Sequence, residues 1–223
     1  MSTVALVALA RPTFDLACAQ GNFDSARALL QELGATVVGP AELVMTVDDV
    51  AAVTLPQADL HILFMASFSD ASPAVELLGS VKGPILGWSM REPGEVGERL
   101  KLNSMCGVNL AAHALMDAGQ SIRHIHGNAN EPHVRAAIAD ALNGTLPAAA
   151  TPAQINGERA PQSVADEAFA WLKGKKVGAV GEAPVGFTPC LFDGPKLNSL
   201  FGLDVRQISI DNAFERISKV EPE

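Results

Sequence analysis

Residues 3–10 read TVALVALA, and this uninterrupted apolar run decides the fold. A continuous apolar stretch of this length is typical of a strand that helices cover on both faces, as in a parallel sheet. Arg11-Pro12 ends the run, and residues 22–33 follow with apolar side chains at helical spacing and Gly34 behind them. We therefore predict a strand and then a helix, with Asn22 as the residue that caps the helix.

The same alternation repeats as far as about residue 143. Further strands are expected at residues 35–38, 60–65, 84–88 and 120–126. Further helices are expected at residues 47–53, 71–78, 108–118 and 131–142. Five strand–helix units in succession predict an α/β fold, namely a flavodoxin-like, doubly wound parallel sheet.

Composition divides the chain into three parts. Residues 1–143 are predicted to form an N-terminal flavodoxin-like α/β domain. Residues 144–162 are rich in Ala, Pro, Thr and Gly without periodicity, which is typical of a linker. Residues 163–223 are predicted to begin a second, incomplete α/β domain with strands at 175–180 and 203–208. These elements are too few to close a second sheet, so we expect a missing C-terminal part or a homo-oligomer to complete it.

The composition argues against several classes of partner. The chain has 223 residues, of which 48% are hydrophobic and 18% charged, and its formal net charge is −9. This acidic balance, without any Lys/Arg cluster, argues against nucleic acid and anionic membranes, since both require basic patches. No apolar run approaches the roughly 20 residues of a membrane span.

The three cysteines, Cys18, Cys106 and Cys190, indicate a reducing compartment. They are odd in number, far apart in sequence and form no CxxC pair, which favours free thiols over disulfides or a zinc site. The apolar N-terminal run lacks a basic region before it, so it predicts a buried strand and not a signal peptide. We therefore expect a cytoplasmic protein.

Two histidines and one cysteine have more than one interpretation. His124 and His126 alternate on the strand expected at 120–126, so they point to the same face near its carboxyl end. They are either two metal ligands or an ordinary polar pair at the end of the sheet. Cys106 lies where a helix begins, so it is either a thiol activated by the helix N-terminus or a small buried residue beside Gly107.

Two other sets of residues have simpler interpretations. His61 and His113 lie in apolar segments, and we expect both to be core or near-core residues with satisfied hydrogen bonds. Gly178, Gly181 and Gly186 follow a predicted strand, but their spacing is that of neither a dinucleotide-binding motif nor a P-loop. We interpret these glycines as turn residues.

Two loops at the carboxyl ends of strands give the strongest local signals. One is Arg11-Pro12-Thr13-Phe14-Asp15, and the other is Trp88-Ser89-Met90-Arg91-Glu92-Pro93, which continues to Arg99 and Asn103. Each places a guanidinium, a hydroxyl and a carboxylate next to an aromatic ring, a mixture that can hold a polyol. Surface turns with local ion pairs explain the same residues equally well. Since both loops follow parallel strands, we expect them to form a cleft at one edge of the sheet.

These stretches resemble the L-fucose/L-arabinose isomerase superfamily, especially its fucose-isomerase-like branch, and the similarity runs nearly from end to end. The resembling segments are Ala10–Asp15, Leu33-Gly34, Val38–Pro40, Gly87-Trp88, Glu92-Pro93, Leu102–Leu110, Gly178–Gly181, Pro184–Phe187 and Phe201-Gly202. Their order and spacing carry the resemblance, rather than any single segment.

The resemblance implies that the chain is the N-terminal portion of a sugar ketol-isomerase. Such enzymes interconvert aldoses and ketoses through an ene-diol. They use Mn²⁺ or a similar divalent ion as a Lewis acid, held by Glu, Asp and His of later domains. The resemblance therefore assigns no catalytic residue, no metal ligand and no cofactor to this chain, and the chain alone is expected to be inactive.

The resemblance also implies a sugar ligand and a homo-oligomer. In the family, the N-terminal domain helps to build oligomers and lends loop residues to the active site of a neighbouring subunit. On that basis six residues are expected on the substrate side: Arg11, Thr13, Asp15, Trp88, Arg91 and Asn103.

Two other functions stay open beside the isomerase. A non-catalytic α/β module that binds a sugar or a partner chain would explain why no Glu, Asp and His cluster is visible in the sequence. A Cys-dependent racemase would need a second Cys or an acid opposite Cys106, which Cys18 or Cys190 would supply only through the tertiary fold.

Overall fold

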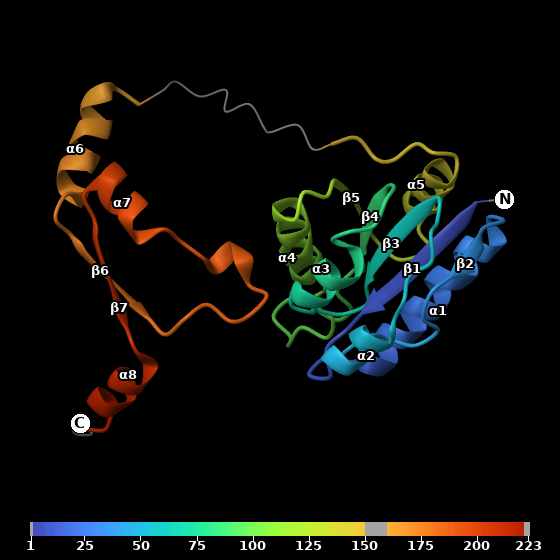
Figure 1. Cartoon of the computed structure of the whole chain (residues 1–223), viewed down its shortest axis with the longest axis horizontal. Coiled ribbons are helices and arrows are strands. Elements are labelled where there is room, and N and C mark those ends of the chain that lie inside the picture. Colours follow the sequence, from blue (N-terminus) through green and yellow to red (C-terminus); the bar gives the residue numbers. More distant parts are fainter. Residues whose placement is uncertain (1, 150–159, 221–223) are drawn as a thin grey trace. The chain divides into compact units, whose positions relative to one another are not determined.

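The computed structural model describes residues 2–149 and 160–220 (Figure 1). The chain divides into two units, of which the first comprises Met1–Ala150 with Val185–Pro189. The second comprises Thr151–Pro184 with Cys190–Glu223. The central part of the predicted linker at 144–162 lies outside the described residues.

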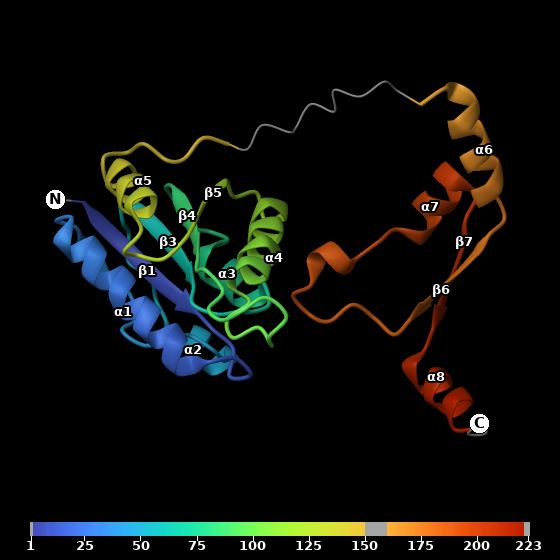
Figure 2. The ribbon, with the colours of Figure 1, turned by 180° about the vertical axis from the view of Figure 1, so that it is seen from behind.

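A five-stranded sheet forms the centre of the first unit (Figures 1 and 2). Its strands are β1 (Thr3–Leu9), β2 (Thr36–Val38), β3 (Leu60–Met65), β4 (Ile85–Ser89) and β5 (Ile122–His126). All neighbouring strands are parallel, in the order β2-β1-β3-β4-β5. This is the strand order of a flavodoxin-like doubly wound sheet, so the predicted fold class is confirmed.

Helices cover both faces of this sheet. They are α1 (Leu16–Glu32), α2 (Val47–Ala52), α3 (Ser72–Leu78), α4 (Ser104–Asp117) and α5 (Pro132–Leu142). Alternate residues of β1 face the two layers: Leu6 and Ala8 pack with α1 and α5, whereas Val7 and Leu9 pack with α2, α3 and α4. The first strand is therefore buried on both sides, as its continuous apolar run predicts.

Two helices begin earlier than the sequence pattern predicts. The Asp15 carboxylate accepts a hydrogen bond from the backbone N–H of Cys18 at 3.0 Å, so α1 begins at Leu16 and the predicted cap at Asn22 is wrong. Helix α4 begins at Ser104 instead of residue 108. Its first turns face the sheet with Ser104 and Gly107, which are buried but not apolar enough to show the helical period.

The second unit contains a two-stranded parallel sheet. Its elements are β6 (Lys176–Val180), β7 (Asp204–Ile208), α6 (Gln162–Leu172), α7 (Gly194–Phe201) and α8 (Ile210–Ile217). The short 3-10 helix η1 (Thr188–Cys190) precedes α7 in the chain, and its first two residues belong to the first unit. Helix α7 was not expected from the sequence; Asp193 caps it by accepting the N–H of Lys196 at 2.9 Å. The rings of Phe169 and Phe201 stack at 5.6 Å. Even so, no residue of this unit within 160–184 and 190–220 is fully buried.

Each helix of the described residues is too short or too polar to cross a membrane.

Candidate functional site

The loops at the carboxyl ends of the parallel strands are tied to one another. The backbone N–H of Arg11 donates to the hydroxyl of Ser67 at 3.0 Å, which joins the loops after β1 and β3. The backbone N–H of Asp15 donates to the carbonyl of Lys101 at 2.9 Å, which joins the loops after β1 and β4. Open α/β sheets bind ligands at this edge, where successive connections leave in opposite directions.

A crevice of about 460 Å³ opens at that point. The chain runs from β1 outward to β2 and then back past β1 to β3, so the loops after these three strands bound the space. This carboxyl-edge crevice has a mixed lining of the polar residues Arg11, Thr46, Ser69, Asp70, Ser72 and Glu76 and the apolar residues Ala10, Pro12, Met45, Val50, Pro73 and Val185. It differs from the predicted cleft between the first and fourth loops, because β3 separates β1 from β4 in the sheet.

Arg11 is the predicted site residue that lines the crevice. Its guanidinium carbon lies 5.8 Å from the centre of the Phe68 ring, a cation–π contact that restrains the side chain. The centre of the Phe68 ring lies 6.0 Å from that of Phe14 and 5.8 Å from that of Phe187. No carboxylate among the described residues forms an ion pair with Arg11. Its guanidinium is therefore free to bind an anionic group of a ligand.

Asp70, one of the two acidic residues of the lining, has a local structural role. One carboxylate oxygen of Asp70 accepts the backbone N–H of Ser72 at 3.0 Å, where α3 begins. The hydroxyl of Ser69 donates to the carbonyl of Asp70 at 3.1 Å. These bonds hold the loop after β3 in shape beside the crevice.

Thr13 and Asp15 belong to the same loop as Arg11 but do not line the crevice. Thr13 is exposed to solvent. Asp15 is exposed as well, and its carboxylate caps α1. The structure therefore gives Asp15 a role in holding the loop rather than a place beside the crevice.

Trp88 lies in the core and not on the substrate side. Its side chain is fully buried, its indole N–H donates to the carbonyl of Gly127 at 2.9 Å, and its ring meets Phe64 edge-on at 5.2 Å. An aromatic ring at the end of a strand is as typical of a core position as of a ligand-binding position. The sequence pattern alone did not distinguish the two. No edge of this ring is open to a ligand, so Trp88 is left out of the proposed site.

Arg91 forms an ion pair with Glu131, at the start of α5. Its Nε lies 2.8 and 2.9 Å from the two carboxylate oxygens, and its Nη2 lies 2.7 Å from one of them. Hydrogen bonds from Arg91 and from the backbone N–H of Asn128 lower the pKa of Glu131 to about 2. This pair agrees with the second interpretation of the loop, namely a surface ion pair. The partner of Arg91 is Glu131, in the connection between β5 and α5, and not the neighbouring Glu92.

Asn103 lies at the junction of the long loop and α4. Its φ of 51° and ψ of 33° place it in the left-handed region, and it is the one non-glycine residue with positive φ among the described residues. Asparagine tolerates this conformation better than most residues. The Glu92 carboxylate accepts the backbone N–H groups of Lys101, Leu102 and Asn103, at 3.0 Å for Leu102 and 2.7 Å for Asn103. Glu92 thereby closes the loop before the helix.

A second polar group lies at the carboxyl ends of β4 and β5. The hydroxyl of Ser89 lies 2.8 Å from Nε2 of His124 and 2.9 Å from Nδ1 of His126. The prediction that both histidines point to one face is confirmed. Burial lowers the pKa of His124, with a smaller effect from His126, and burial together with the charge of Arg91 lowers the pKa of His126. Both rings are therefore neutral near pH 7.

Sequence reasoning did not single out Ser89 as a member of this group. Ser89 ends β4, which adjoins the strand of both histidines. In the parallel register Ser89 lies opposite His126. Only the strand order, which the sequence does not state, shows that β4 and β5 are neighbours.

Cys106 lies in the first turn of α4 and is exposed, so its interpretation as a small buried residue is wrong. Gly107 beside it is the buried residue. Cys18, Cys106 and Cys190 are all free thiols, as predicted.

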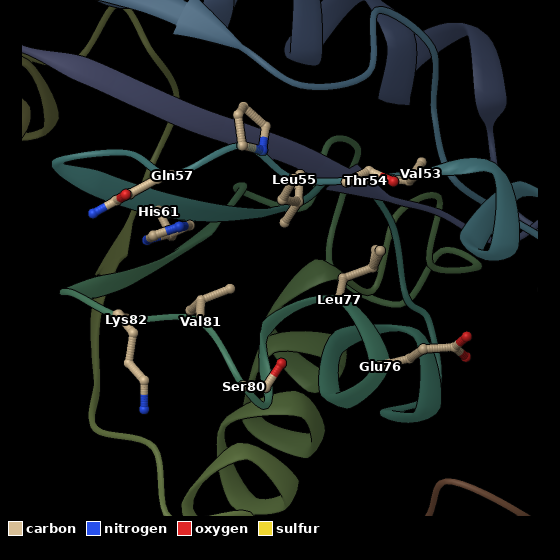
Figure 3. Close-up of a pocket in the computed structure, with 11 residues that line it drawn as sticks. Val53, Thr54, Leu55, Gln57, His61, Glu76, Leu77, Ser80, Val81 and Lys82 are labelled. Carbon is tan, nitrogen blue, oxygen red and sulfur yellow. The ribbon is translucent and has the colours of Figure 1, made fainter.

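A cavity of about 500 Å³ lies at the opposite, amino-terminal edge of the sheet, among the segments before β3 and β4 (Figure 3). His61 lines it and is 2% exposed. No described residue forms a hydrogen bond with Nδ1 of His61, and burial lowers the pKa of the ring. His61 is therefore a core residue as predicted, but its Nδ1 lacks the expected hydrogen-bond partner among the described residues. His113 is exposed, contrary to prediction, and its Nδ1 lies 2.8 Å from the hydroxyl of Thr188.

Metal ligands do not gather in the part of the chain that the structure describes. Within residues 2–149 and 160–220, no three His, Cys, Asp or Glu side chains are placed to hold an ion. The described residues therefore offer no site for the Mn²⁺ that the resemblance assigns to later domains, and no step through a metal ion follows from them.

Comparison with known proteins finds relatives in sugar chemistry. The chain is 26% identical to the sulfoquinovose isomerase of Priestia aryabhattai over 223 residues, covering 98% of this chain and 45% of the relative. It is 29% identical to the sulfoquinovose isomerase of Alkalicoccus urumqiensis over 233 residues, covering 100% and 46%. For the sulfoquinovose isomerase of Clostridium sp. (strain MSTE9) the identity is 28% over 225 residues, covering 99% and 45%.

The chain thus spans about half the length of the curated relatives it matches. No protein-family model matches it. The names of these relatives agree with the sugar-isomerase part of the resemblance, but none of the three is named a fucose or arabinose isomerase.

Proposed function

We propose that this chain forms the N-terminal portion of a sugar ketol-isomerase whose substrate is a sulfonated hexose such as sulfoquinovose. The carboxyl-edge crevice binds the sulfonate, and Arg11 is its principal ligand. The finer assignment to the fucose/arabinose isomerase superfamily belongs to the same proposal. A complete protein would use a divalent ion such as Mn²⁺ at residues outside those described.

The observation that carries the proposal is the position of Arg11 and its lack of an ion-pair partner among the described residues. The guanidinium stands at the position where this fold binds ligands, is restrained on Phe68 and has no ion pair among the described residues. A sulfonate presents three acceptor oxygens, and guanidinium binds such groups through parallel N–H bonds. Thr46, Ser69 and Ser72 line the same crevice.

The chemistry assigns this chain a binding role. A sulfonate takes no part in aldose–ketose conversion, so binding energy gained there serves to hold and orient the reacting end of the sugar. For such a substrate we expect the arginine that binds the anion and the centre that reacts to be separate.

A titration of the ¹⁵N-labelled chain with sulfoquinovose tests the proposal. We expect amide shifts in residues 10–15 and 67–73, and binding of D-glucose, which lacks the sulfonate, roughly 10- to 100-fold weaker. Arg11→Gln should abolish the difference between the two sugars. Arg27→Gln is the matched control, because Arg27 also stacks on a phenylalanine, Phe23, at 5.1 Å but lies outside the crevice. Equal affinity for both sugars, or shifts confined to other residues, would contradict the proposal.

An activity assay tests the division of roles. With Mn²⁺ and sulfoquinovose, the chain alone should give only the background rate of ketose formation. Turnover that EDTA abolishes and Mn²⁺ restores would show that the reacting centre lies within this chain.

A further inference from the structure

Ser89, His124 and His126 form a hydrogen-bonded row that the proposed anion site does not use. The register pairs Ser89 with His126 and Gly87 with His124. Because Gly87 has no side chain, the ring of His124 can reach across to Ser89. The hydroxyl oxygen of Ser89 is fully buried between the two inner nitrogens, Nε2 of His124 and Nδ1 of His126.

The single proton of this hydroxyl couples the tautomers of the two rings. If Ser89 donates to His126, then His124 must donate to Ser89, and both rings carry their proton on Nε2. If Ser89 donates to His124, both rings carry it on Nδ1. In either state, one outer nitrogen is a hydrogen-bond donor and the other is an acceptor.

The competing arrangement uses Met105. Its sulfur lies 3.8 Å from the Ser89 hydroxyl, and if Ser89 donates to it, both rings can donate inward. A thioether is a weak acceptor beside an imidazole nitrogen, so the coupled states are favoured. Neither outer nitrogen, Nδ1 of His124 or Nε2 of His126, bonds to a described residue. Both outer nitrogens are therefore available to a ligand.

We propose that Ser89, His124 and His126 form a proton relay that opens the pyranose ring of a sugar hemiacetal. This rests on the proposed function, because ketol isomerisation requires the open-chain sugar. The ring centres lie 6.5 Å apart. One hexose can therefore contact both rings, and in the proposal its two hemiacetal oxygens meet the two outer nitrogens.

The proton balance closes without a metal ion or other co-reactant. One outer nitrogen removes the proton from the anomeric hydroxyl, and the C1–O1 bond becomes a carbonyl as the bond from C1 to the ring oxygen breaks. The outer N–H of the other ring gives its proton to that ring oxygen. Inside the row, the inner N–H of the first ring passes its proton to Ser89, whose own proton passes to the second ring. The relay ends in its other tautomeric state, and ring closure by the reverse path restores it.

Two features of the structure suit this chemistry. The lowered pKa values leave both rings neutral near pH 7, so that one can accept and the other donate. His124 is exposed and His126 is half-buried, so a sugar can reach the row from solvent. A positioned acid–base pair of this kind accelerates proton transfer by roughly 10²- to 10⁴-fold.

Mutarotation of α-D-glucose by this chain tests the relay, followed by polarimetry in a buffer without imidazole or phosphate. We expect a rate that rises in proportion to the protein concentration. His124→Gln and His126→Gln should each lower it at least about tenfold. His113→Gln, the matched control for an exposed histidine outside the row, should leave it unchanged. A rate equal to that of buffer, or an equal loss in the control, would overturn the proposal.

Ser89 is a positioning residue, so its test needs a readout that a structural role would not move. Ser89→Ala should abolish the acceleration, and Ser89→Thr, which keeps the hydroxyl, should retain it. Long-range ¹H–¹⁵N spectra of the unaltered chain should show the same fraction of the Nδ1–H tautomer in both rings. Opposite tautomers, with both rings donating inward, would overturn the relay even if the variants fail to fold.

Failure of the relay and failure of the anion site give different results. Mutarotation of glucose needs neither a sulfonate nor Arg11. Binding of sulfoquinovose without mutarotation would therefore remove the relay alone, whereas mutarotation without preference for sulfoquinovose would remove the anion site alone.

Discussion

Gly107 should not tolerate one added methyl group, although it lies inside a helix. A Cβ at this position would lie 2.8 Å from the sulfur of Met65, 2.9 Å from its Cγ and 3.2 Å from the Cα of Phe68. Met65 can rotate away, but Phe68 is contacted at its backbone, and its N–H is bonded to the carbonyl of Leu102 at 2.7 Å. The close approach of α4 to β3 therefore depends on the missing side chain.

Two effects of opposite sign decide the magnitude. Overpacking of a buried site costs about 1–3 kcal/mol. Replacing glycine by alanine inside a helix contributes about 1 kcal/mol of stability. Gly107→Ala should therefore lower the free energy of unfolding by a net amount of about 1 kcal/mol.

Gly21→Ala is the matched control. Gly21 lies inside α1, and a Cβ there would meet nothing within 4 Å. This variant should gain about 0.5–1 kcal/mol, so the two substitutions should change stability in opposite directions.

Urea unfolding provides the measurement. The chain has two tryptophans, so a Trp171→Phe background leaves the buried Trp88 as the fluorescent reporter of the first unit. If Gly107→Ala proves as stable as Gly21→Ala in this background, the described contact between α4 and β3 is wrong. The placement of Asn103 and Ser104 at the head of α4 would then have to be revised with it.

Two further predictions concern single ionisable groups. The folded-state pKa of Glu131, about 2, lies below the ordinary value of 4.5, so its contribution to stability is present above pH 4.5 and is lost as the pH falls toward 2. The urea midpoint of Glu131→Gln should therefore lie below that of the unaltered chain at pH 6, and the gap should narrow as the pH falls from 4.5 toward 2; a constant gap would contradict the ion pair with Arg91. Burial lowers the pKa of His61 below 6.5, so stability should fall as the pH drops from 6.5, where the unfolded chain takes up a proton first. His61→Leu should reduce this fall in the thermal midpoint between pH 7.5 and 5, and an unchanged pH dependence would show that His61 is not the buried neutral histidine described.

The sequence predicts the fold well because its strongest signal, the uninterrupted apolar runs, has one physical explanation. The apolar runs at residues 3–10 and 60–65 can be buried on both faces only in a covered sheet, and the structure buries both. Helix starts are predicted less well. Polar Asp15 and the small residues Ser104 and Gly107 set the starts of α1 and α4, and none of them contributes to a hydrophobic period.

The candidate site is only partly visible in the sequence. Arg11 could be predicted, because a guanidinium directly after the first strand must lie at the carboxyl edge of the sheet. Trp88 and Arg91 could not be assigned, because the deciding partners, Gly127 and Glu131, lie about 40 positions away along the chain. The row of Ser89 with the two histidines depends on the strand order, which local patterns do not contain.

The carboxylate of Glu92 gives the long loop after β4 an anchored base and an independent tip. Its hydrogen bonds to the backbone of residues 101–103 join the two ends of the loop. The residues between these ends take no part in those bonds. Val96 at the tip is fully exposed, and Gly94 and Gly97 beside it adopt positive φ. A foreign peptide inserted between Val96 and Gly97 would therefore extend into solvent without disturbing the sheet edge below. The loop is a natural attachment point for an epitope tag or a fluorophore.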